Sequence, residues 1–209
     1  MNRCAVLISL IVLAPASALF GAKVKFISTW KAPDANHLTY AGRKVVSLVM
    51  SDDDALRMSA EEALARELTA RGVEGVSAYR MIPREEIKDP ARAKGWFERS
   101  GAAGVVAMRL VDVARETTPP SVMWASPTYG SLWSYYPYGW GSSYTIVPGR
   151  NDLKVMVETL VFDVPGNRLL WAATSQSTNP ASVQAFMKDL VKACADEMRK
   201  QGLTRKSDR

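Results

Sequence analysis

The sequence contains little of the chemistry that most enzymes and metal sites require. It has one histidine, His37, and two cysteines, Cys4 and Cys194, among 209 residues. The GxSxG, HExxH and CxxC motifs do not occur, and neither does a phosphate-binding loop. His37 follows Pro, Asp and Asn residues in an expected loop, where a lone histidine is more often solvated than catalytic. We therefore expect no enzymatic activity, no cofactor and no metal site.

Long hydrophobic runs are also missing, except at the start of the chain. Residues 4–14 are apolar, Pro15 ends the run, and small residues occupy 16–18. With one basic residue before it, this order is typical of a secretory signal peptide over residues 1–18, cleaved before Leu19. The run is short for a membrane span, although an uncleaved signal that anchors the protein stays open. We expect an exported, periplasmic protein that is membrane-associated only if the signal is retained.

The charge is moderately basic and is not concentrated in one stretch. The net charge is +6 and the pI is about 9.4. Removal of the signal, which contains one arginine, would leave 26 basic against 21 acidic residues, or +5. An exported protein rarely meets nucleic acid, so we expect no such partner. Weak attraction to anionic lipid or polysaccharide is the expected consequence.

Cysteine usage gives no disulfide framework. Cys4 lies in the expected signal, so the mature chain would keep only Cys194, which could be a nucleophile or an intermolecular link. The interpretation we favour is a small core residue on the last helix, because it shares a helical face with apolar residues. These are Val183, Phe186, Met187, Leu190, Val191 and Met198.

Hydrophobic periodicity predicts one α/β (α+β) domain over residues 19–204, with a flexible basic tail at 205–209. The expected order is β-β-α-β-α-β-loop-β-β-α, a mixed sheet packed by about three helices. The segment 44–79 reads as strand, helix and strand, which predicts a crossover between parallel strands. Expected strands are 23–30, 44–50, 73–83, 102–116, 153–162 and 168–175; expected helices are 51–72, the later part of 84–101, and 180–202 with Asn179 as its cap.

Three groups of charged residues are candidates for a site. Residues 52–54 are consecutive aspartates, which we interpret as a helix cap rather than a metal site. Arg109 and Asp112 could form a buried pair, but a solvated edge is the favoured interpretation. Glu158 and Asp163 lie on one hairpin and could serve as glycosidase carboxylates, yet their spacing favours plain surface charges.

The segment 117–150 follows neither the helical nor the strand period, and Pro and Gly interrupt it repeatedly. We expect a long aromatic loop, and ordered loops of this length are often functional. Three interpretations stay open, in order of preference: a satellite core over the sheet, a contact surface for a protein partner, or a platform for sugar rings. The candidate contact residues are Trp124, Trp133, Tyr135, Tyr136, Tyr138, Trp140 and Tyr144.

Several short motifs occur in an order that resembles a family of bacterial envelope lipoproteins, the domain-of-unknown-function 4136 group. They are "STWKAP" near the start, Arg57 with Glu61 or Glu62 on a helix, "SAYRMIP", and the hairpin "VETLVFDVPGNRLLWAATS". The resemblance covers most of residues 26–203 and implies a fold similar to the N-terminal domain of TolB. Ala22 stands where the family's lipidated cysteine is expected, so lipidation cannot occur there.

Together these features predict an exported envelope protein that acts as a non-enzymatic binding or assembly accessory module. Its partner would be an envelope protein or a component of the cell wall or lipopolysaccharide. The alternative is a carbohydrate- or lipid-binding module that uses the same aromatic rings. A hydrolase based on His37 or paired carboxylates is the least favoured alternative.

Overall fold

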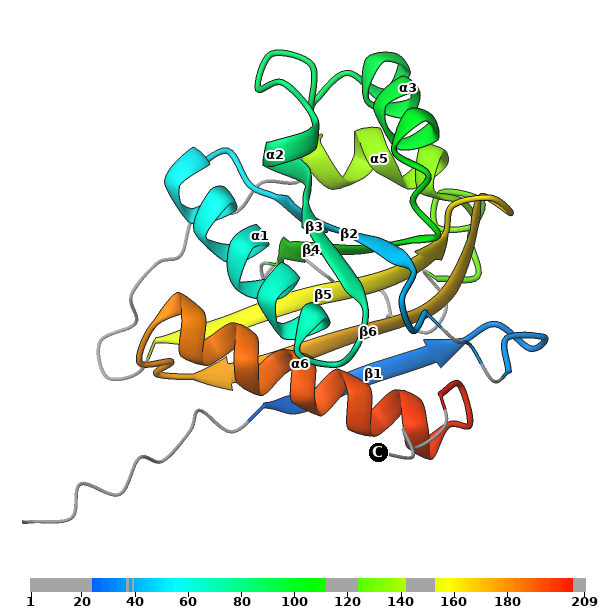
Figure 1. Ribbon diagram of the computed structural model, residues 1–209. Helices are drawn as coiled ribbons and strands as arrows, with labels where there is room; N and C mark the ends of the chain where they lie inside the picture. Colours follow the sequence, from blue (N-terminus) through cyan, green and yellow to red (C-terminus); the bar gives the residue numbers. More distant parts are fainter. Residues whose placement is uncertain (1–23, 37, 39, 112–123, 142–152, 205–209) are drawn as a thin grey trace, which may run out of the picture.

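The computed structural model describes residues 24–36, 38, 40–111, 124–141 and 153–204. Over these residues the chain forms one six-stranded mixed sheet with five helices, which confirms the predicted α/β class (Figure 1). The strands are β1 (Lys25–Lys31), β2 (Lys44–Met50), β3 (Glu74–Ser77), β4 (Gly104–Leu110), β5 (Lys154–Asp163) and β6 (Arg168–Thr178). The helices are α1 (Asp54–Thr69), α2 (Ala78–Met81), α3 (Pro90–Ser100), α5 (Leu132–Gly141) and α6 (Val183–Lys200).

The strand order in the sheet is β1-β6-β5-β4-β2-β3. Strand β2 pairs in parallel with both β3 and β4, so the predicted parallel crossover through α1 is confirmed. Strands β4, β5, β6 and β1 pair antiparallel in turn. The central strands β4 and β5 are buried almost throughout, which explains their nearly continuous apolar sequence.

Helices cover both faces of the sheet and divide the core into two layers. On one face, α1 and α6 pack Leu64 and Leu190 against the strands. On the other face, α2, α3 and α5 pack over Leu48, Ala107 and Leu160 (Figure 1). Strands β2, β4 and β5 supply alternate residues to the two layers, as a strand's period of two requires.

The structure differs from the predicted elements in three places. The predicted strand 73–83 ends at Ser77, and its second half is the short helix α2. The predicted loop 117–150 contains helix α5. Helix α6 begins at Val183 with Ser182 as its cap, whereas Asn179 has a φ of 50° and its Oδ1 accepts from the N–H of Leu153.

Other predicted local features agree with the structure. Asp53 caps α1 by accepting from the N–H of Leu56 at 3.0 Å. Gly101 ends α3 in the left-handed conformation. Cys194 is buried on α6, and burial raises the pKa of its thiol to about 12, which is typical of an inert core cysteine. Among the described residues, no helix is both long enough and apolar enough to cross a membrane.

Candidate functional site

Helix α5 is the feature that the aromatic segment builds. The hydroxyl of Ser131 accepts from the N–H of Ser134 at 3.1 Å, as a capping residue does at the start of a helix. The helix buries residues at positions i, i+3, i+4, i+7 and i+8, which form one helical face. These are Leu132, Tyr135, Tyr136, Gly139 and Trp140.

The candidate contact residues divide into three groups in the structure. Four are buried in the core beneath and beside α5: Trp124, Tyr135, Tyr136 and Trp140. Trp133 and Tyr138 are half-buried and lie at the edges of the helix. Tyr144 lies outside the described residues. In this conformation the four buried rings are closed to a partner, as the satellite-core interpretation requires, and contact by the aromatic residues stays a prediction.

Beneath α5 lies an ion pair between Arg109 and Glu158. The two residues face each other in the register of β4 and β5, and Arg109 Nε donates to Glu158 Oε2 at 2.5 Å. Both side chains are buried, so the expectation of solvent-exposed charges at these positions is wrong. Asp112, the other partner considered for Arg109, lies outside the described residues.

Aromatic residues of α5 and of the described segment before it make further contacts with this ion pair. Tyr135 donates to Glu158 Oε2 at 3.0 Å, and the indole N–H of Trp124 donates to Oε1 at 3.2 Å. The ring of Tyr138 lies 4.9 Å from the Arg109 guanidinium carbon, within cation–π range. Burial and then the charge of Glu158 hold the pKa of Tyr135 well above its ordinary value, so its hydroxyl stays a donor.

Helix α5 also holds the segment between α2 and α3. The hydroxyl of Tyr136 donates to the carbonyl of Ile87 at 2.5 Å, and the ammonium of Lys88 lies 5.6 Å from the ring centre of Trp140. This segment and the start of α1 line an open hollow of about 400 Å³. Its lining residues are Asp52, Asp54, Arg84, Glu85, Ile87 and Lys88.

Two ion pairs span the hollow and use its aspartates. Lys88 Nζ lies 2.6 Å from Asp52, and Arg84 Nη2 lies 2.5 Å from Asp54. Within the described ranges, no group of three or more His, Cys, Asp or Glu side chains could hold a metal ion. Asp53 caps α1, and Asp52 and Asp54 form the ion pairs.

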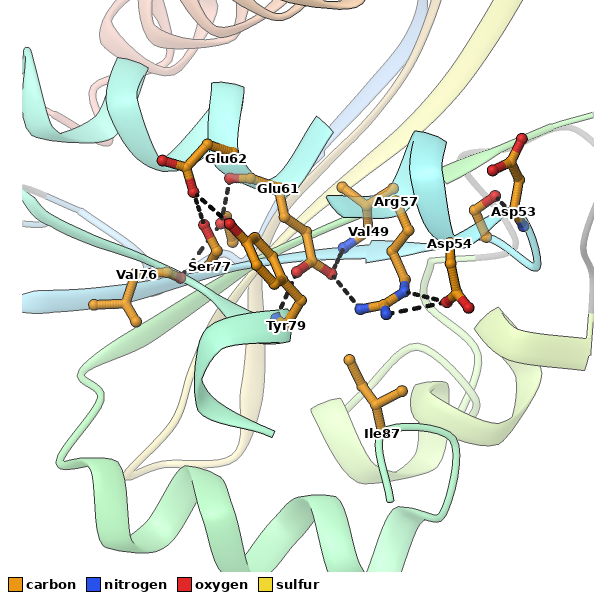
Figure 2. A network of polar contacts seen from close by, with 12 residues as sticks. Val49, Asp53, Asp54, Arg57, Glu61, Glu62, Val76, Ser77, Tyr79 and Ile87 are labelled. Carbon is orange, nitrogen blue, oxygen red and sulfur yellow. Dashed lines mark hydrogen bonds and ion pairs between the residues drawn. The ribbon is translucent and has the colours of Figure 1, made fainter. Parts of the chain in front are cut away.

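A second buried network joins α1 to β2 and α2, and Figure 2 shows it from close by. Glu61, which is fully buried, accepts from the backbone N–H of Val49 at 3.1 Å and of Tyr79 at 2.7 Å. Arg57 Nη1 lies 3.6 Å from Glu61 Oε1, and its other nitrogens donate to Asp54. In the sequence, Arg57 and Glu61 stand out only as parts of a motif. Their spacing of four residues on a helix was the signal that they could pair.

The remaining catalytic candidates do not meet. Glu158 is buried under α5, whereas Asp163 accepts from the N–H of Gly166 in the hairpin turn. We expected no SxxK motif, and this was wrong, because Ser28 and Lys31 have the spacing found in some serine hydrolases. On strand β1 they face opposite sides of the sheet. His37 lies outside the described residues. The described carboxylates of this site are engaged in structural bonds.

Comparison with known proteins identifies no family for the chain. No protein-family model matches it, and no curated protein matches it significantly. A PelC dodecamer from Paraburkholderia phytofirmans aligns at 15% identity with a TM-score of 0.47, over 88% of this chain and 99% of that one. A variant PelC dodecamer from that organism aligns at 15% identity with a TM-score of 0.44, over 80% of this chain and 90% of that one. Lipoprotein GNA1162 from Neisseria meningitidis aligns at 14% identity with a TM-score of 0.40, over 76% of this chain and 99% of that one. These scores carry no inference about function, and the resemblance to the lipoprotein family stays a prediction.

Proposed function

We propose that this protein is an exported envelope protein that binds a partner protein through the outer face of α5 and performs no catalysis. We define the α5 outer face as Trp133, Ser134, Pro137, Tyr138 and Gly141. Ser134, Pro137 and Gly141 are exposed, and the two half-buried rings flank them. We infer export because residues 1–18 have the order of a secretory signal peptide.

The observation that carries the proposal is the absence of charge on this face. Helix α5 contains no charged residue, and the sequence from 117 to 149 contains none either, in a chain that is 23% charged. The exposed sides of α3 and α6 bear ion pairs such as Lys94 with Glu98 and Lys192 with Asp196. Protein interfaces are depleted of charge at their centre and enriched in Tyr and Trp, so the α5 outer face has the composition of a contact surface.

The interior of the site favours binding over catalysis. Arg109, Trp124 and Tyr135 donate to the two oxygens of Glu158, which leaves this carboxylate in a structural role. The same bonds fix α5 against the sheet. Such a rigid support reduces the entropy that a surface loses when it binds a partner.

A saccharide ligand is the second candidate, and one observation favours it. At about 100° per residue, Trp133 and Tyr138 point to either side of the strip formed by Ser134, Pro137 and Gly141. Two flat rings beside a small, uncharged strip could stack on the faces of a sugar chain. Soluble peptidoglycan fragments are the probe that tests this candidate.

The combined variant Trp133→Ser/Tyr138→Ser is expected to lose its partner while it stays folded. Trp133 packs on Phe97, and Tyr138 covers Arg109 and accepts a hydrogen bond from it, so we expect a loss of about 2–5 kcal/mol in unfolding free energy. The measurement is recovery of cross-linked partner from cell envelopes, with melting checked by circular dichroism. Trp30→Ser, which removes a half-buried ring from edge strand β1, is the matched control.

The outcomes separate the candidates. Loss of the same partner protein in the double variant, with retention in Trp30→Ser, supports protein binding. A tryptophan fluorescence change on adding peptidoglycan fragments, absent in the double variant, would favour the saccharide candidate instead. Full retention of the partner by the folded double variant would show that the α5 outer face is not the binding surface.

A further inference from the structure

Helix α3 presents an exposed arginine, Arg99, that is held in place but has no counter-ion. Its guanidinium carbon lies 4.4 Å from the ring centre of Trp96, within cation–π range. Among the described residues, its side chain donates no hydrogen bond and forms no ion pair. We propose that Arg99, supported by Trp96, binds a carboxylate in an acidic segment of a partner protein. This site lies outside the α5 outer face and does not depend on it.

The indole beneath the guanidinium has a fixed position. Trp96 Nε1 donates to Glu86 Oε2 at 2.7 Å, and Arg92 Nη1 lies 3.8 Å from the other oxygen of Glu86. The Trp96 ring also packs against the core on the α5 side of the sheet. The platform under Arg99 is therefore held both by a hydrogen bond and by packing.

Gly95 provides the space that the guanidinium occupies. A Cβ at this position would lie 3.1 Å from Arg99 Nη1, closer than an ordinary contact. Glycine weakens the interior of a helix relative to alanine, so its place here serves the approach of the Arg99 side chain. The guanidinium thus lies against α3 itself, over Trp96, instead of extending into solvent.

The donors of Arg99 are available, whereas the other two cations of α3 are paired. Arg92 lies 3.8 Å from Glu86, and Lys94 lies 3.8 Å from Glu98. A guanidinium carries five N–H donors in its plane, so contact through its face leaves them able to bind a ligand. Within the part of the chain that the structure describes, Arg99 is the cation of α3 with a support and no counter-ion.

The charges around the site favour a carboxylate over a phosphate. The two oxygens of a carboxylate match the fork of a guanidinium, and its single negative charge balances one cation. The exposed carboxylate of Glu98 follows next to Arg99 in the sequence. It would repel a phosphate dianion, or the second phosphate of a lipid surface. An aspartate or glutamate side chain of a protein supplies the group that fits.

The support also lowers the cost of binding. An exposed arginine loses side-chain freedom when a ligand fixes it, and Arg99 has already lost part of this freedom over Trp96. Arg66 offers a matched comparison, because it is also exposed and also lies in the last turn of its helix. It has no ring contact among the described residues. We expect Arg99 to bind a carboxylate peptide about fivefold more tightly than Arg66 does.

The test is an NMR titration of the full mature chain with a tetraglutamate peptide. The side-chain Nε–H signals of Arg99 and Arg66 are followed in the same sample. The Arg99 signal is expected to move saturably, with a dissociation constant about fivefold lower than at Arg66. Tetraglutamine should leave both signals in place. Inorganic phosphate should bind at Arg99 more weakly than tetraglutamate, and tighter binding of phosphate would overturn the assignment to a carboxylate.

Two variants separate the support from the charge. Trp96→Leu keeps the charge of Arg99 and removes the ring beneath it, so the affinity at Arg99 should fall to that at Arg66. Arg66→Lys should leave the affinity at Arg99 unchanged. Equal dissociation constants at the two arginines of the unmodified protein would overturn the proposal, and this comparison decides it even if Trp96→Leu does not fold.

Discussion

Replacing Glu158 with glutamine is expected to lower the free energy of unfolding by about 3–5 kcal/mol, because it leaves the charge of Arg109 buried without its counter-ion. Both side chains lie under α5, and Arg109 Nε is 2.5 Å from Glu158 Oε2. The glutamine also offers one oxygen where Trp124 and Tyr135 each donate to a separate one. Urea denaturation followed by circular dichroism measures the change.

A double variant separates the charge effect from the packing effect. Arg109→Met combined with Glu158→Leu removes both charges and keeps apolar volume, and such replacements of buried pairs are often tolerated. We expect it to be more stable than Glu158→Gln, although Tyr135 and Trp124 still lose an acceptor. A double variant that is less stable than Glu158→Gln would show that the tyrosine and tryptophan bonds matter more than the ion pair.

Replacing Gly75 with alanine is expected to cost about 3 kcal/mol or more in unfolding free energy, at the upper end of overpacking effects. A Cβ at this position would lie 2.2 Å from the backbone oxygen of Ala65. Strand β3 approaches α1 closely at this point, and a main-chain oxygen cannot move aside as a flexible side chain can. Thermal and urea unfolding of the variant measure the loss.

Two controls show whether the clash is with the backbone. Gly141→Ala places its Cβ in open space and is expected to change stability by less than about 0.5 kcal/mol. Ala65→Gly should not rescue Gly75→Ala, because the obstructing atom belongs to the main chain. Rescue by Ala65→Gly would contradict the close approach of β3 to α1.

The sheet and its main helices could be predicted from the sequence because their periods are regular. Strands β2, β5 and β6 and helices α1 and α6 all lie close to the predicted ranges. Gly101 correctly predicted the end of α3, and Asp53 the start of α1, because a left-handed C-cap and an acidic N-cap depend only on the local sequence. Asn179 was misleading, because its side chain bonds to the start of the neighbouring strand instead of capping a helix.

Helix α5 could not be identified because a proline and a glycine, which ordinarily break helices, stand in its interior and a second glycine ends it. Its buried positions do follow the helical period, but Gly139 stands at one of them. The side chain of Met50 occupies the space that a Cβ of Gly139 would need, so glycine here serves packing rather than a turn. Pro137 lies on the exposed side of the same helix. Whether a helix tolerates Gly139 and Pro137 depends on tertiary contacts, which cannot be read from a single sequence.

The buried ion pairs were missed for a similar reason. Arg109 and Glu158 are 49 residues apart, and only the register of β4 and β5 brings them together. Each is flanked by uncharged residues, a pattern that also suits an exposed position on a strand edge. Their burial depends on the cover by α5, so an unrecognised helix led to an incorrect placement of the charges beneath it.

The most direct test of the central claim is site-specific photo-crosslinking from the α5 outer face in intact cells. A photoreactive amino acid at position 134 or 137 replaces an exposed residue and leaves the buried rings in place. The same probe at Lys188 or Lys192, on the exposed side of α6, is the control. We expect a discrete adduct with one envelope protein from positions 134 and 137 and none from α6. Equal adducts from both faces, or adducts from α6 alone, would contradict the assignment of α5 as the binding surface.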